Sequence, residues 1–211
     1  MKWDEAVKGM RGRPIHLISA FVTDGEWHGI NSIPDIGHLG ADDLIWTING
    51  FWKYLPNCDL GFEMHDFGGP SYEAMDDPEW YYEECLRKAK CPVFMPREDA
   101  RFPQVIEYPL DEILRFYSMR PYFGESPNYC IALAGMLECP QLTLHGFGYP
   151  NGYKKQGERA STEFWLGMVK SRGTKITAIF DGNDNTRLVL TPDEWEDFYE
   201  PRMYGYRRGS A

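Results

Sequence analysis

The sequence is poor in positive charge. Its 211 residues contain 22 Lys and Arg against 32 Asp and Glu, a formal net charge of −10. A surface of that sign repels the phosphate backbone of DNA and RNA, so a nucleic-acid partner is not expected. The single basic cluster, from Arg202 to Arg208, is diluted by Tyr and Gly and is interpreted as a tail rather than a binding patch.

Paired cysteines and long apolar runs are also missing. The cysteines are odd in number and contain no Cys-x-x-Cys pair, which argues against a disulfide framework and against a structural zinc site. Neither a metal nor another cofactor is expected. No signal peptide and no apolar run of membrane length is found, so we expect a cytoplasmic protein without a membrane partner. The cysteines are Cys58, Cys85, Cys91, Cys130 and Cys139.

The length fits one domain with a sizeable core. We expect a lead-in over 1–13, a Rossmann-like ligand-binding domain over 14–190, and a C-terminal helix and tail over 191–211. Aromatic residues are abundant, with seven Trp, thirteen Tyr and twelve Phe. They can build a rigid core and can also stack on a planar ligand.

Short apolar runs alternate with helical patterns along most of the chain. Such alternation predicts the α/β class: a single Rossmann-like domain with a mostly parallel sheet of about five to seven strands and helices on both faces. Strands are expected over 14–21, 44–48, 60–64, 92–95, 104–108, 142–144 and 175–180. Helices are expected over 51–55, 79–89 and 110–116, from about Pro127 to Leu137, around 164–169, and from Pro192 onward.

Polar residues follow two of the predicted strands. Asn49 follows the second strand, where it can contact a base or sugar, or can simply form a turn before Gly50. His65 and Asp66 follow the third strand and can move a proton or hold a ribose or phosphate; the alternative is a packed histidine and a loop cap. Parallel strands gather their carboxyl ends on one edge, so these residues are predicted to line one cleft.

The same cleft is predicted to include a helix start and a Gly-rich turn. Ser126 begins a helix, as an N-cap or as a point where free N–H groups meet an anion. Gly146 and Gly148 flank Phe147 after the 142–144 strand, and a turn of this kind is typical of a ligand edge. His145 is expected to be a packed core histidine.

One ion pair and a basic loop complete the candidate set. Arg159 and Glu163 are four residues apart, which favours either an ordinary helical ion pair or an arginine held ready for a phosphate or carboxylate. Lys154, Lys155 and Arg159 make the segment after Gly148 the most basic part of the chain, which favours an anionic small ligand.

In this order, these motifs resemble a phage-borne Rossmann-like family. That family is related to 6-hydroxymethyl-dihydropterin pyrophosphokinase-like proteins and, remotely, to bacterial CMP-sialic-acid transferases. The resemblance covers roughly residues 14–180 and implies a nucleotide-type ligand, a transferase ancestry and, for a phage protein, the host cytoplasm. The matching positions are Asn49, His65-Asp66, Ser126, Leu144-His145-Gly146, Arg159, Glu163 and Arg172-Gly173.

Two family features are absent. The relatives carry a Gly-x-Gly-Pro-Ser turn after the first strand, where this chain has Ser19 to Gly25, and an Asp where this chain has Gly148. Loss of a phosphate cradle and a polar group predicts a nucleotide binder with weak or lost catalysis, for example one that sequesters a host signalling nucleotide. An active transferase and an interaction protein without ligand are the alternatives, and a homo-oligomer is left open.

Overall fold

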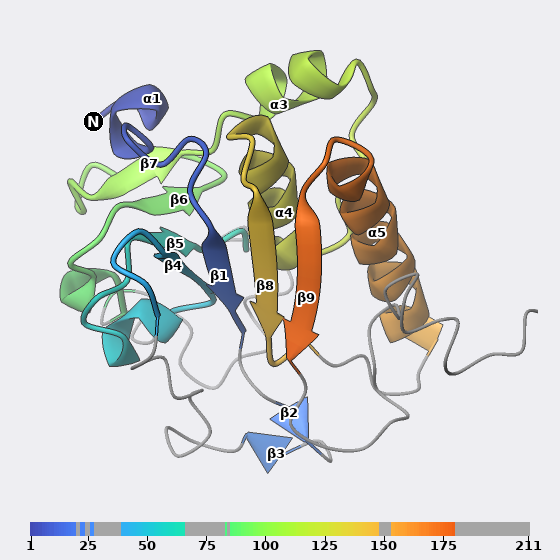
Figure 1. Ribbon diagram of the computed structural model, residues 1–211. Coiled ribbons are helices and arrows are strands. Elements are labelled where there is room, and N and C mark those ends of the chain that lie inside the picture. The colour runs from blue at the N-terminus through green and yellow to red at the C-terminus, as the bar shows by residue number, and fades with distance from the viewer. Residues whose placement is uncertain are drawn as a thin grey trace, which may run out of the picture.

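Seven parallel strands form one sheet in the computed structural model, which describes residues 1–19, 22–23, 26–27, 39–65, 83, 85–147 and 153–179 (Figure 1). The α/β Rossmann-like class predicted from the sequence is confirmed. The strand order is β7-β6-β5-β4-β1-β8-β9. The strands are β1 (Ile15–Ile18), β4 (Leu44–Ile48), β5 (Leu60–Phe62), β6 (Val93–Met95), β7 (Val105–Glu107), β8 (Gln141–His145) and β9 (Lys175–Ile179). A separate two-stranded ribbon pairs β2 (Val22–Thr23) with β3 (Glu26–Trp27).

The central strands are buried on both faces. Every residue of β1 and of β4 is buried, as expected for a parallel sheet covered on both sides. Side chains alternate between the faces along a strand, so two distinct surfaces result.

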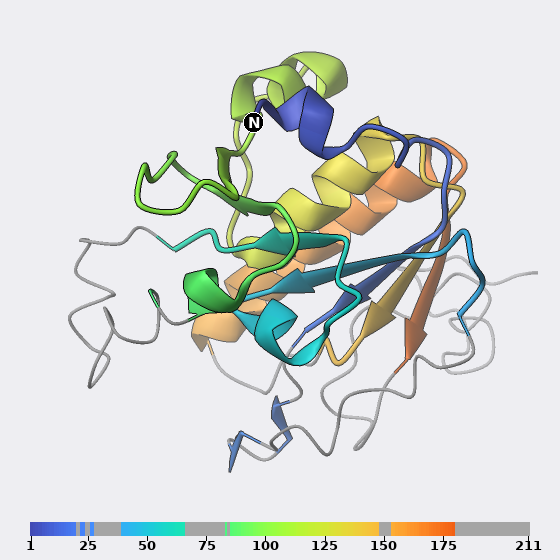
Figure 2. The same ribbon diagram turned by 90° about the vertical axis from the view of Figure 1, so that its left-hand side faces the viewer.

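The first surface, here called the α4 face, packs against two helices, and a third helix packs on one of them. Ile15, Leu17 and Trp46 point to this face and join one large apolar cluster. Figure 2 shows α4 and α5 lying along one side of the sheet, with α3 beyond one end. The helices are α3 (Leu110–Tyr117), α4 (Ser126–Met136) and α5 (Tyr153–Lys170).

The second surface, here called the η2 face, is covered by the short 3₁₀ helix η2 (Phe51–Tyr54) and a helical turn over 85–88 (Figure 2). Trp52 lies so close to β5 that a Cβ added at Gly61 would be 2.6 Å from its ring, so glycine is required there. The Trp52 indole N–H donates to the Cys85 carbonyl oxygen at 2.8 Å. Both faces therefore carry helices, as predicted.

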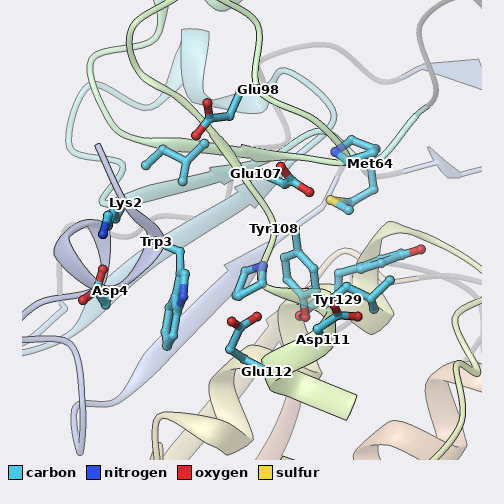
Figure 3. A pocket seen from close by; sticks show the side chains of 14 residues that line it. Lys2, Trp3, Asp4, Met64, Glu98, Glu107, Tyr108, Asp111, Glu112 and Tyr129 are labelled. Atoms are coloured by element: carbon cyan, nitrogen blue, oxygen red, sulfur yellow. The ribbon is translucent and has the colours of Figure 1, made fainter. Parts of the chain in front are cut away.

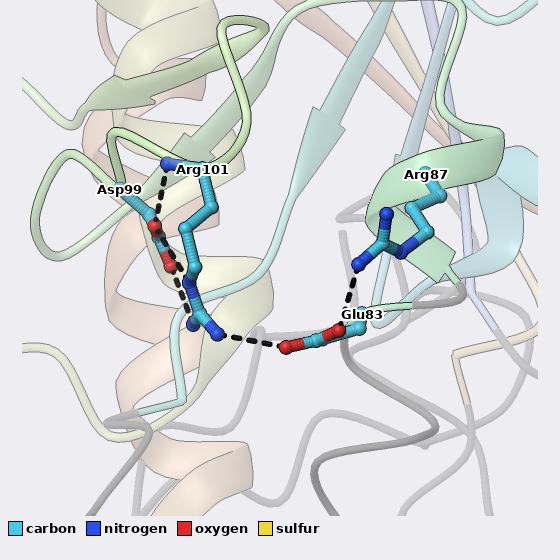
Figure 4. Close-up of polar contacts among 4 residues, drawn as sticks. All are labelled: Glu83, Arg87, Asp99 and Arg101. Atoms are coloured by element: carbon cyan, nitrogen blue, oxygen red, sulfur yellow. Dashed lines mark hydrogen bonds and ion pairs between the residues drawn. The ribbon is translucent and has the colours of Figure 1, made fainter.

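Charged side chains form an ion-pair network next to the helical turn over 85–88. Arg101 donates to Asp99 at 2.9 Å and to Glu83 at 2.7 Å, and Glu83 also accepts from Arg87 at 3.0 Å (Figure 4). The network ties the segment before β7 to the helical turn that packs on the sheet.

The N-terminal segment includes a short helix and contributes to the core. Residues Trp3–Ala6 form α1, and Ala6, Val7 and Met10 are buried in the main cluster. The predicted C-terminal helix from Pro192 lies outside the described residues. In the described part of the chain, no helix is both long enough and apolar enough to span a bilayer.

Candidate functional site

The order of the strands places a switch point between β1 and β8. After β1 the chain adds strands outward to β7, and then returns to add β8 and β9 on the other side. The two carboxyl ends are joined where the Ser19 N–H donates to the His145 carbonyl oxygen at 3.0 Å. Gly146 follows with a φ of 74°, a left-handed turn that favours glycine. In open α/β sheets, ligands bind outside the strands at such a point.

A carboxylate and a histidine pair at the carboxyl end of β5. Glu63 Oε1 lies 2.5 Å from His65 Nδ1. The Glu63 side chain is 7% exposed and that of His65 is 46% exposed, so a buried acid holds a histidine that reaches solvent. Hydrogen bonding to Glu63 raises the pKa of His65 above 6.5, although burial acts in the opposite direction. An imidazole fixed at Nδ1 can donate or accept a proton at Nε2.

Glu63, rather than Asp66, is therefore the described partner of His65. The sequence does contain a signal for it, because residues two apart in an extended chain lie on the same side. Glu63 was missed because it follows the apolar run Leu60–Phe62 and was counted as part of the strand. Asp66 lies outside the described residues.

Two more histidines meet inside the η2 face. His16 Nδ1 and His145 Nε2 are 2.9 Å apart, so one ring donates to the other. Asp43 Oδ2 lies 3.6 Å from His16 Nε2. His145 is 2% exposed, in line with the expectation of a packed histidine, and His16 is 9% exposed. This hydrogen bond joins β1 to β8 across the switch point. The two histidines are far apart in the sequence, so no local pattern could predict that they pair.

Asn49 forms a left-handed turn directly after β4. Its φ is 52° and that of Gly50 is 77°, and its N–H donates to the Phe62 carbonyl oxygen at 2.9 Å. The backbone geometry of Asn49 therefore agrees with the turn-forming interpretation. The position also lies at the carboxyl edge, between the strand that leads to His65 and the one that ends near Gly146.

Ser126 is the first residue of α4 and is 8% exposed, but its side chain does not cap the helix. The residue at the cap is Glu125, whose carboxylate accepts a very short hydrogen bond from the Thr162 hydroxyl. Asn128 Nδ2 donates to the same hydroxyl at 2.7 Å, and Asn128 Oδ1 accepts from the Gly124 N–H at 2.8 Å. These hydrogen bonds connect the start of α4 to α5.

Arg159 and Glu163 form the predicted ion pair on α5, with Nε and Oε1 2.6 Å apart. Ser161 packs beside Gly124 on the α4 side of the helix. At about 100° per residue, Arg159 and Glu163 point roughly 160° away from Ser161. The pair therefore does not face the start of α4. Lys154 and Lys155, expected on a loop, belong to the first turn of α5.

A cavity of about 710 Å³ lies beside the carboxyl ends of β5, β6 and β7, on the α4 side (Figure 3). Trp3, Tyr108 and Tyr129 form its aromatic walls. Met64, the residue between Glu63 and His65 in the sequence, also lines it. Its charged lining is one lysine, Lys2, and five acids: Asp4, Glu98, Glu107, Asp111 and Glu112. This lining repels a phosphate.

The predicted residues are thus divided between the two faces. His65 is paired with Glu63, whose side chain lies on the η2 face, and Asn49 lies in the left-handed turn that follows β4. Ser126 and the Arg159–Glu163 pair belong to helices on the α4 face. Gly146 lies between the two groups at the sheet edge, and Gly148 is outside the described residues. None of the described candidates lines the 710 Å³ cavity.

Sequence comparisons find no matching protein-family model and no similar curated protein. Among solved structures, the chain is similar to the sialyltransferase CstII from Campylobacter jejuni in complex with a substrate analogue, cytidine-5'-monophosphate. The two share 14% identity with a TM-score of 0.45, over 88% of this chain and 98% of that chain. A similarity of this size transfers no residue role and no substrate. The resemblance to a phage-borne family stays a prediction.

Proposed function

We propose that this protein binds a nucleotide-type small molecule at the carboxyl edge of its sheet. His65, Asn49 and Gly146 are the proposed contacts on this edge, and Ser126, which begins α4 on the other face of the sheet, is a further proposed contact. The observation that carries the proposal is the Glu63–His65 pair, in which a buried carboxylate orients a half-exposed imidazole at a strand end. Fixed polar groups in this position are what a ligand site in an open α/β sheet requires.

Charge supports an anionic group on the ligand near His65. The raised pKa of His65 extends the pH range in which both ring nitrogens donate hydrogen bonds. A protonated imidazole can then give a charge-assisted hydrogen bond to a phosphate or carboxylate oxygen. The acidic cavity beside β7 opposes the same anion, which favours an orientation towards β1 and β8.

The spacing of the strands favours an extended ligand. From β5 to β8 there are three steps across the sheet, which at about 4.8 Å each make roughly 14 Å. A nucleotide has separate base, sugar and phosphate parts that can occupy successive strand ends. The absent Gly-x-Gly-Pro-Ser turn and the Gly at position 148 support binding with weak chemistry, including sequestration of a signalling nucleotide.

An active transferase is the second candidate function, and the same pair favours it. An imidazole oriented through Nδ1 by a buried carboxylate is the arrangement that general acid–base catalysis uses. Such a group accelerates proton transfer by about 10²–10⁴-fold. The two candidates therefore share a site and differ in whether the ligand is altered.

The first experiment measures thermal shifts of the full chain with a panel of nucleotides and nucleotide sugars, followed by chromatography of the recovered ligand. A binder raises the melting temperature with ligand concentration and returns the ligand intact. A transferase returns a product. Absence of any shift across the panel would contradict the proposal.

Two substitutions of one residue separate binding from chemistry. His65→Ala removes both hydrogen bonding and proton transfer, and we expect at least a 10-fold loss of affinity, about 1.4 kcal/mol. His65→Gln keeps a donor and an acceptor but cannot transfer a proton at neutral pH. If His65→Gln retains affinity while product formation falls 100-fold, the transferase is correct; retained affinity without product in either protein supports the binder.

A further inference from the structure

A pair of thiols lies at the opposite, amino-terminal edge of the same sheet. Cys58 precedes β5 and Cys91 precedes β6, and the two Sγ atoms are 3.4 Å apart. β5 and β6 are paired neighbours with Gly61 opposite Val93, so Cys58 lies one register position away from the residue opposite Cys91. Sulfur atoms joined by a disulfide are about 2.05 Å apart, so an approach of roughly 1.4 Å converts contact into a bond.

We infer that Cys58 and Cys91 form an oxidation site that closes into an intramolecular disulfide when a small hydroperoxide reaches it. The site is separate from the proposed ligand edge, because both cysteines precede the strands whose far ends carry Glu63 and Met95. It needs no metal and no residue of the Glu63–His65 pair.

The surroundings of the two thiols differ, and this difference decides which sulfur attacks the peroxide and which one then forms the disulfide. The Cys58 Sγ donates to the Leu60 carbonyl oxygen at 3.2 Å and lies 3.6 Å from Thr47 Oγ1, so its thiol is held in place. The contact with Cys58 lowers the pKa of Cys91, whereas the contact with Cys91 and burial raise that of Cys58. Both sulfurs line one cavity, and although Cys58 is the more exposed residue and Cys91 is 5% exposed, the lowered pKa of Cys91 leads us to assign it the first attack and Cys58 the resolving one.

A small cavity provides access to both sulfurs. It has a volume of about 60 Å³ and is lined by Cys58, Cys91 and three lysines, Lys53, Lys88 and Lys90. A water molecule occupies about 30 Å³ of liquid, so the cavity admits a molecule of peroxide size and is too small for a tripeptide disulfide such as oxidised glutathione. The three lysines give the cavity a positive lining, whereas the Asp59 carboxylate acts to raise the pKa of Cys91.

The chemistry balances with hydrogen peroxide as the oxidant. The Cys91 thiolate attacks one peroxide oxygen, the O–O bond breaks, and a sulfenic acid and hydroxide form. The Cys58 sulfur then attacks the Cys91 sulfur, the S–O bond breaks, and the departing hydroxide takes the Cys58 proton as water. Overall, two thiols lose two protons and two electrons, and one hydrogen peroxide becomes two waters.

The other cysteines provide matched controls. Cys139 is buried in the main cluster, and burial raises its pKa to about 11. Cys130 is fully buried in α4, and its pKa is also raised by burial. Cys85 is buried in the same cluster as Cys91 and is the competing partner to exclude. Lower thiolate content, offset in part by higher nucleophilicity, makes Cys139 at least about 10-fold slower than Cys91.

The test treats the reduced full chain with hydrogen peroxide and counts thiols before and after. We expect five thiols to fall to three, a mass loss of two hydrogens, one cross-linked peptide joining Cys58 to Cys91, and recovery of five thiols with dithiothreitol. Oxidised glutathione should act at least about 10-fold more slowly, since it does not fit the cavity. Cross-linking through Cys85, or oxidation of Cys139 as fast as Cys91, would overturn the inference.

Two variants identify the order of events. In Cys58→Ser, the sulfenic acid on Cys91 has no resolving thiol and should be trapped by dimedone, while Cys91→Ser should give neither adduct nor disulfide. Cys85→Ser is the matched control and should still form the disulfide. Peptide mapping of the unsubstituted protein decides the pairing even if a variant fails to fold, and a dimedone adduct on Cys58 instead of Cys91 would reverse the assigned roles.

Discussion

Trp46 and Thr47 are neighbours in β4, are both fully buried, and point to opposite faces of the sheet. Trp46 belongs to the large apolar cluster of the α4 face. Thr47 points to the η2 face, where its hydroxyl lies 3.6 Å from Cys58 Sγ. The same strand thus contributes a core residue on one side and a polar contact on the other.

The contrast extends along the central sheet. Among the described residues, the buried polar side chains in or directly after the strands all fall on the η2 face: His16, Thr47, Glu63, Thr143 and His145. The α4 face of the same strands is apolar. Burial of polar groups costs free energy unless they are hydrogen-bonded, so a fold tolerates them where they serve a purpose. We therefore expect stability to depend on the α4 face and chemistry on the η2 face.

The largest effect should come from Trp46→Ala. The side chain is fully buried and packs at a tilt against Phe62, with ring centroids 5.4 Å apart. Removing a buried aromatic ring leaves a cavity and costs about 3–5 kcal/mol. Urea unfolding followed by circular dichroism measures the change. Ligand affinity at the opposite face should remain unchanged in the folded fraction.

Thr47→Val is the matched substitution on the η2 face. It keeps the branched shape and removes only a weak contact with sulfur, so we expect a loss of no more than about 1 kcal/mol. If Thr47→Val destabilised the protein as much as Trp46→Ala, the division between the faces would be wrong.

Gly135→Ala should have the next largest effect, because α4 passes its neighbours closely at this point. An added Cβ would lie 2.2 Å from the Tyr117 hydroxyl and 2.7 Å from Val169 Cγ2. That hydroxyl donates to the Ala132 carbonyl oxygen at 2.9 Å and would be displaced. Overpacking costs about 1–3 kcal/mol, which exceeds the helical gain of up to about 1 kcal/mol for Gly to Ala.

The control for this substitution is Gly167→Ala on α5. Gly167 is exposed, and a Cβ there would meet nothing within 4 Å. The higher helix propensity of Ala should then act without any steric cost and stabilise the protein by roughly 0.5–1 kcal/mol. Opposite signs for the two Gly-to-Ala changes in thermal unfolding are the expected result; equal signs would contradict the close packing of α4.

Glu63→Gln should give a smaller effect with a characteristic pH dependence. Glu63 raises the pKa of His65 in the folded protein above the ordinary 6.5. The stabilisation is therefore fully present below the unfolded pKa and is lost as pH rises through the folded pKa. We expect the unsubstituted protein to exceed Glu63→Gln in stability by more at about pH 6 than at about pH 9.

The measurement is a urea midpoint for both proteins at the two pH values. His65 is half-exposed, so solvent screening keeps the effect modest. A second comparison, Glu63→Gln in a His65→Gln background, should show no pH dependence, because the titrating partner is gone. If the difference in stability between the two proteins were the same at both pH values, Glu63 would not be raising the pKa of His65.

The elements of the fold were largely predictable because their signals are local. The 44–48 strand is observed with the predicted bounds, and the 110–116 helix is one residue longer. The helix expected at 51–55 is a 3₁₀ turn, 51–54. Trp3–Ala6 was not expected as a helix, since its four residues are stabilised by burial of Ala6 and Val7 in the distant core rather than by local pattern.

The candidate site was less predictable, because its contacts join distant segments or depend on orientation. The position of His65 at a strand end followed from the apolar run before it. Its partner depended on which side of the chain Glu63 faces, and the His16–His145 contact spans 129 residues of sequence. Pairing across a sheet is decided by strand order, which a single sequence does not contain.

The smallest effect should follow Arg159→Ala, which tests the two interpretations of the α5 ion pair. The Arg159 and Glu163 side chains are 43% and 35% exposed, and exposed pairs of this spacing contribute about 0.3–0.5 kcal/mol. We expect a loss of stability of that size and a ligand affinity within about twofold of the original. Glu163→Gln, the matched variant, should match it, since either change breaks the same pair. Thermal unfolding and ligand titration measure both quantities. A tenfold loss of affinity in Arg159→Ala alone would show instead that Glu163 holds the guanidinium for an anionic group of the ligand.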